Sequence, residues 1–201
     1  MTATRRALSA ASAMVVGLLG LGLTGTSASA TPVPNAEQTA PMTASPISSV
    51  LSTSGSTDRV LLASGVVLTM AASDVAAAQQ AAAQASTTAQ PGGSIGGDCG
   101  SSYAYMFDNP YTGQPWRFST GFHVIHAAID YSWNAVVDTP NSTYEYHASG
   151  GLFFDTTWAG GHNGNGPHGL YVAAVDPDTS YAILDTGSVC YSAGPYAETD
   201  L

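Results

Sequence analysis

The chain has 201 residues, with 4 Lys and Arg against 14 Asp and Glu, and only 9% of its residues are charged. This composition allows one ordinary domain with appendages, argues against a coiled coil, and contains no apolar run long enough for a membrane-spanning helix. The scarcity of cations also excludes the basic surface that nucleic-acid binding requires.

The first 30 residues have the three parts of a secretory signal. Arg5 and Arg6 form a positive start, residues 13–23 an apolar stretch, and residues 28–30 a small-residue cleavage site. The apolar stretch is too short to span a bilayer of about 30 Å. We therefore expect a secreted, extracellular protein that begins near Thr31 and does not insert into membranes, exported by either the general secretory or the twin-arginine route.

Residues 31–97 contain no aromatic residue and are rich in Ala, Ser and Thr. Because a hydrophobic core needs large side chains, we expect this stretch to be a disordered arm. It is compatible with a removable pro-region and with a flexible linker, and its composition favours the linker. One short helix is predicted at residues 73–85, with Ser73 as its N-cap.

Every Phe, Tyr and Trp lies between Tyr103 and Tyr196, so the folded domain is expected at residues 98–201. Residues 122–138 alternate in polarity, which predicts two strands or one bent strand. The predicted apolar face consists of Ile125, Ala127, Ile129, Tyr131, Trp133, Ala135 and Val137.

Further strands are predicted at residues 143–147, 152–158, 170–175 and 181–190, with a glycine-rich loop at residues 160–169. Short alternating strands separated by turns are typical of an all-β domain, either an antiparallel β-sandwich or a small β-barrel. Cys99 and Cys190 are the only cysteines, and in an oxidising exterior they are expected to form one disulfide that ties the two ends of this domain together.

The glycine-rich segment is the most unusual local feature of the sequence. Its glycines would let the backbone approach a ligand, and it offers hydrogen-bonding side chains at His162, Asn163, Asn165 and His168. The same composition is typical of a flexible solvated loop, and this alternative stays open.

Three aromatic residues lie near this segment. Tyr144 and Tyr146 share one face of a predicted strand, and Trp158 leads directly into the glycines. On a surface, such rings stack on sugars or anchor a protein partner, while in a domain this small most rings belong to the core.

No standard hydrolase, zincin or nucleotide-binding motif is present. The weak catalytic candidates are Asp155, His162 and His168, as a histidine with a carboxylate. The spacing of His162 and His168 is nonspecific for metal binding, so no metal and no cofactor is predicted.

These observations favour a secreted, non-catalytic recognition or effector module that binds a carbohydrate, a cell-envelope polymer or a protein. The predicted binding residues are Tyr144, Tyr146, Trp158, His162, Asn163, Asn165 and His168. Two alternatives are a small secreted hydrolase that uses His and Asp near the glycine-rich loop, and a structural extracellular protein.

Overall fold

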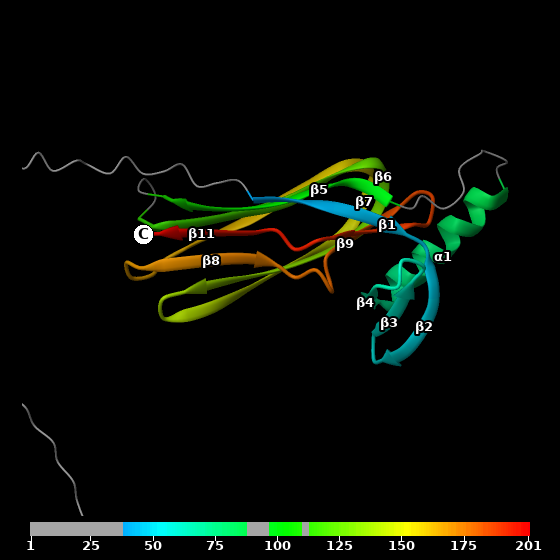
Figure 1. Ribbon diagram of the computed structural model, residues 1–201, viewed down its shortest axis with the longest axis horizontal. Coiled ribbons are helices and arrows are strands. Elements are labelled where there is room, and N and C mark those ends of the chain that lie inside the picture. The colour runs from blue at the N-terminus through cyan, green and yellow to red at the C-terminus, as the bar shows by residue number, and fades with distance from the viewer. Residues whose placement is uncertain (1–37, 88–96, 110–112) are drawn as a thin grey trace, which may run out of the picture. The chain divides into compact units, whose positions relative to one another are not determined.

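The computed structural model describes residues 38–87, 97–109 and 113–201. The predicted signal peptide and its cleavage site lie outside these residues. Within them the chain forms eleven strands and one helix (Figure 1). The elements are β1 (Gln38–Ser45), β2 (Ile47–Ser54), β3 (Thr57–Leu62), β4 (Val67–Ala71), α1 (Ala72–Thr87), β5 (Gly97–Asp108), β6 (Trp116–Thr139), β7 (Ser142–Gly164), β8 (Leu170–Val175), β9 (Tyr181–Leu184), β10 (Val189–Ser192) and β11 (Tyr196–Asp200).

Five antiparallel strands close into a barrel in the order β6, β5, β1, β10, β9 and back to β6. The prediction of an all-β antiparallel fold is therefore confirmed, with the barrel as its architecture. Beyond the barrel, β8 and β11 continue the sheet from the C-terminal part of β6, and β7 pairs with β6 along most of its length. Within the described ranges, no helix is both long and apolar enough to cross a membrane.

The long strand β6 bends in its middle, which confirms the prediction of one bent strand. Its pairing with β9 shifts by one residue between Ala128 and Asp130, and its pairing with β7 is irregular between His123 and Asp130. A shift of one residue turns every following side chain to the opposite face, so the buried positions change from even to odd numbers across the bend. The predicted apolar face is therefore right from Tyr131 onward and wrong at Ile125, which is 60% exposed.

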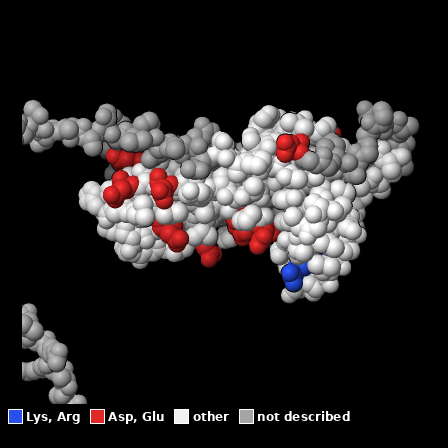
Figure 2. All heavy atoms as spheres, in the orientation of Figure 1, with Lys and Arg blue, Asp and Glu red and all other residues white. Residues whose placement is uncertain are grey.

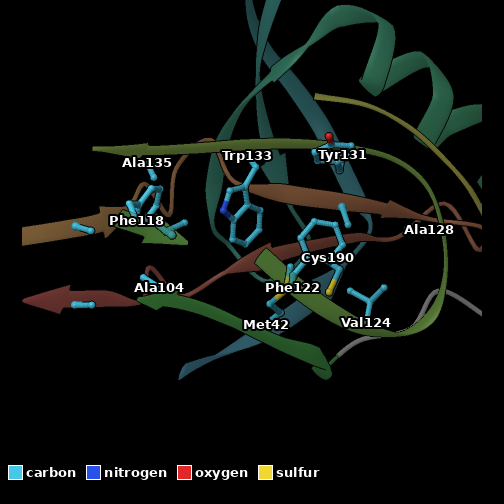
Figure 3. Close-up of a cluster of buried hydrophobic side chains, with 14 of the residues drawn as sticks. Met42, Ala104, Phe118, Phe122, Val124, Ala128, Tyr131, Trp133, Ala135 and Cys190 are labelled. Atoms are coloured by element: carbon cyan, nitrogen blue, oxygen red, sulfur yellow. The ribbon is translucent and has the colours of Figure 1, made fainter. Parts of the chain in front are cut away.

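The barrel is filled by the rings of β6. Trp133 lies in the middle of the cluster, near Phe118 and Phe122, with Met42 of β1 on the opposite wall (Figure 3). The buried indole Nε1 of Trp133 donates to Thr120 Oγ1 at 2.9 Å, and Thr120 Oγ1 donates to the Tyr103 carbonyl at 2.8 Å. The polar atoms next to Trp133 are thus paired, as burial requires, whereas the buried Nε1 of Trp116 at the start of β6 has no hydrogen-bond partner among the described residues.

Residues 38–87 differ from the predicted disordered arm. Strand β1 lies between β5 and β10, with Met42 and Ala44 buried in the barrel. Because β6 supplies the large rings, the strand facing them needs no aromatic side chain, and the composition of a linker is compatible with that role. Helix α1 spans the residues where the sequence predicts a helix.

The predicted disulfide between Cys99 and Cys190 is present, with both residues fully buried. Cys99 lies within β5, a strand that is not among those predicted from the sequence. The bond joins β5 to β10, the two strands that flank β1. It therefore fastens the barrel where its N-terminal strand is inserted.

A second core covers the outside of β9 and β10. There the sheet β2–β3–β4 and helix α1 pack against Tyr181, Ile183 and Val189. All four residues of β9 are buried, because its inward side chains fill the barrel and its outward ones contact this second layer. The hydroxyl of Tyr181 donates to Asp74 Oδ2 in the first turn of α1 at 2.8 Å.

The C-terminal strands differ from the prediction in two places. The predicted strand at 181–190 is divided into β9 and β10 by a turn in which Gly187 has a φ of 79° and approaches the backbone of α1 at Ala82. A side chain at Gly187 would be strained and would collide with the helix, so glycine is required there. Strand β11, which the sequence did not predict, pairs with β8, whose predicted bounds are confirmed.

Candidate binding surface on strands β5, β6 and β7

Much of the predicted glycine-rich loop is part of β7, which runs without interruption from Ser142 to Gly164. Its glycines leave room for aromatic rings. A methyl group at Gly164 would lie 2.9 Å from Trp116 Cη2 and closer still to Cζ2, and one at Gly160 would lie 2.8 Å from Trp158 Cζ2. These glycines therefore allow close packing of rings against β7, and this packing explains their presence without a ligand.

The three predicted stacking residues Tyr144, Tyr146 and Trp158 are half-buried and pack against the barrel core. The ring of Trp158 lies 4.8 Å from that of Tyr131, and the ring of Tyr146 lies 5.8 Å from that of Phe118. Much of the ring surface of these residues is therefore buried against other rings. They stabilise the packing of β7 on the core and present little free ring surface to a ligand.

The candidate acid–base residues are not brought together. His162 is exposed and stacks on Tyr144, with ring centroids 4.3 Å apart. Asp155 lies at the bend of β7, where its carboxylate accepts from the Thr156 amide at 2.7 Å. The seven residue steps from Asp155 to His162 correspond to about 20 Å of extended strand.

His168 lies after the end of β7 and lines a small cavity of about 140 Å³ together with Asp108, Pro115 and Leu201. Asn165 is exposed just before it. In the part of the chain that the structure describes, no group of three His, Cys, Asp or Glu side chains is placed to hold a metal ion.

The outer face of β5 carries an aromatic strip that sequence reasoning missed. Tyr103, Tyr105 and Phe107 alternate with the buried Ala104 and Met106, so all three point away from the barrel. Their ring centroids are 5.0 Å apart for the first pair and 5.6 Å for the second. The period-two run of rings in residues 103–107 is the signal that could have identified the strip.

Small and polar residues continue this face across the neighbouring strands. In the pairing register, Tyr105 lies opposite Ser119 of β6, and Ser119 lies opposite Gly161 of β7. The next row along the strands consists of Phe107, Arg117 and Asn163. Because residues directly opposite each other share a face, these rows form one surface with rings on one side and polar groups on the other.

A groove of about 540 Å³ lies at the β7 side of this surface, lined by Gln114, Arg117, Gly160, Gly161, His162 and Asn163. Arg117 is exposed and makes no ion pair with any residue that the structure describes. Of the predicted binding residues, His162 and Asn163 thus belong to the groove, while Gln114 and Arg117 are additions from the tertiary structure. We define the aromatic strip and this groove together as the β5–β7 face.

Comparison with known protein families, with curated proteins and with solved structures returned no match.

Proposed function

We propose that the protein is a secreted, non-catalytic recognition module that binds a neutral polysaccharide along the β5–β7 face. The observation that carries the proposal is the continuity of an outward-facing, half-buried aromatic strip with a polar groove that contains a guanidinium without an ion pair to any described residue. Aromatic rings provide flat apolar surfaces on which the C–H faces of sugars stack, and planar polar side chains bind neighbouring hydroxyls.

In this arrangement Tyr105 and Phe107 support successive sugar rings. Arg117 and Asn163, which lie in the same row as Phe107, donate to hydroxyl and ring oxygens of the polymer. In the neighbouring row, Tyr105 is followed across β6 and β7 only by the small residues Ser119 and Gly161. A flat ligand can therefore approach the backbone of these two strands closely.

The overall charge favours a neutral polymer over a polyanion. The chain carries a formal charge of −10, and the face drawn in Figure 2 shows acidic side chains spread over several elements, with blue only over the β2–β4 sheet. A polyanion would be repelled by this field, whereas stacking and hydrogen bonding to uncharged sugars are insensitive to it. Binding should therefore change little between low and high salt.

The test is co-sedimentation of the protein, expressed from Thr31, with insoluble cellulose, chitin and xylan, and with purified peptidoglycan as an anionic comparison that should bind less. Arg117→Gln and the pair Tyr105→Ala and Phe107→Ala should each weaken binding to the retained polymer at least tenfold, about 1.4 kcal/mol. Two matched variants should bind as the wild type does. Arg59→Gln removes the same charge from β3, and Tyr196→Ala removes a half-exposed ring from β11.

Equal losses in the matched variants, or binding that disappears at 0.5 M salt, would contradict the proposal. Failure of the folded protein to bind any polysaccharide would leave the structural role as the better explanation. The hydrolase alternative has no geometric support, since the arrangement of Asp155, His162 and His168 described above places them apart.

A further inference from the structure

The bend of β7 displays two aromatic rings at its tip. Phe153 is 92% exposed with a φ of 50°, and Phe154 is 67% exposed with a φ of 71°. A left-handed conformation costs about 1–2 kcal/mol for such a residue, whereas glycine adopts it without that cost. Both the strained backbone of these residues and the exposure of their apolar rings to water are energetically unfavourable.

One of these rings forms the wall of a groove. Phe154, Ile129 of β6, and Ala77 and Ala81 of α1 line a groove of about 270 Å³, with Asp185 of the β9–β10 turn among the polar residues around it. The groove is separate from the β5–β7 face, because the two share no lining residue. It is large enough for one or two aliphatic side chains.

The charged side chains near this groove are acidic. Asp185 lines it, and Asp155 lies close by, because the Asp185 amide donates to the Ala127 carbonyl while Asp155 pairs with the next residue of β6, Ala128. The chain has no lysine, and the two arginines that the structure describes lie elsewhere. Arg117 is in the β5–β7 face, and Arg59 points away from the buried side of β3 that contains Val60.

We infer that this groove is a docking site for a cationic amphipathic segment of a partner protein. An aliphatic side chain of the segment occupies the groove beside Phe154, and its Lys or Arg side chains pair with Asp185 and Asp155. An anionic membrane is repelled by the same acids, which separates this surface from the aromatic anchors of peripheral membrane proteins. The inference is independent of polysaccharide binding, since it concerns another surface.

The test measures the affinity of the protein, expressed from Thr31, for three 14-residue peptides by fluorescence anisotropy. The first places Leu and Lys at helical spacing to form an apolar and a cationic face, the second has the same composition in scrambled order, and the third carries Glu in place of Lys. Only the first should bind, and its affinity should fall at least tenfold between 50 mM and 500 mM salt.

Two variants and two matched controls assign the binding to the groove. Phe154→Asn removes the ring and retains a residue that tolerates the left-handed backbone, and it should weaken binding at least tenfold. Asp185→Asn should weaken binding severalfold and reduce its salt dependence. Leu170→Asn on β8, which is 57% exposed, and Asp178→Asn in the turn before β9 should leave it unchanged.

The inference is overturned if Phe154→Asn binds the amphipathic peptide as tightly as wild type, or if Leu170→Asn loses as much affinity. It is also overturned if the protein binds vesicles of phosphatidylcholine and none of the peptides, because the tip would then be a membrane anchor. Circular dichroism of Phe154→Asn reports whether the variant is folded, and its polysaccharide binding, measured in parallel, keeps the two proposals separate.

Discussion

Gly164 provides a direct test of whether the glycines of β7 serve packing or ligand approach. In the variant Gly164→Ala the added methyl group would lie 2.9 Å from Trp116 Cη2 and would overlap Cζ2. Trp116 is 3% exposed and its ring is surrounded by those of Tyr144 and Tyr171, with centroids 6.3 and 6.2 Å away. The indole cannot move aside without displacing its neighbours.

The size of the effect follows from two opposing contributions. Overpacking of a filled core costs about 1–3 kcal/mol, and the lower entropy of alanine in the unfolded chain returns about 0.4–1 kcal/mol. The net destabilisation should be about 1–2 kcal/mol, which for a domain of this size lowers the melting temperature by about 2–4 °C per kcal/mol.

Equilibrium urea unfolding, followed by tryptophan fluorescence, measures this difference. The matched control is Gly151→Ala, because the nearest atom to a methyl group at Gly151 is the Ile129 carbonyl oxygen at 3.7 Å, an ordinary contact. That variant should be as stable as the wild type or slightly more stable. Wild-type stability of Gly164→Ala, combined with loss of polysaccharide binding, would refute the packing argument and restore the ligand-approach interpretation.

Three further predictions concern the rest of the fold. Tyr181→Phe should lower the free energy of unfolding by about 1.5–3 kcal/mol in urea titrations, because it removes the donor to the buried Asp74 Oδ2, while the Ser73 hydroxyl donates only to Oδ1. Burial, with a smaller contribution from Asp74, raises the pKa of Asp130 above 3.8, so the folded state holds this proton more tightly than the unfolded state. Asp130→Asn should therefore be more stable than wild type at pH 7, and the difference should vanish as the pH falls through the raised pKa to below 3.8; a difference independent of pH would contradict this. A fragment of residues 98–201 lacks β1 between β5 and β10 and should give the poorly dispersed NMR spectrum of an unfolded chain, whereas a well-dispersed spectrum would show that the barrel closes without β1.

The candidate binding surface was only partly accessible from the sequence. His162 and Asn163 were identified from their residue types and do line the groove, while Tyr144, Tyr146 and Trp158 pack against the core. The strip of Tyr103, Tyr105 and Phe107 has a readable period of two, but its pairing with Arg117 depends on the register between β5 and β6. Register is a property of strand pairing, and no local pattern specifies it.

The sequence by itself determined the class of the fold and its cross-link. The alternation around Trp133 and the two cysteines suffice for this, because period-two burial and disulfide chemistry depend on local pattern and residue type. Only the tertiary structure decided that β1 is a barrel strand, that Gly160 and Gly164 make room for rings, and that Phe154 stands beside α1. Each of these features depends on which segment, distant in sequence, packs next to the residue in question. Close packing fixes that neighbour only when the whole chain is folded.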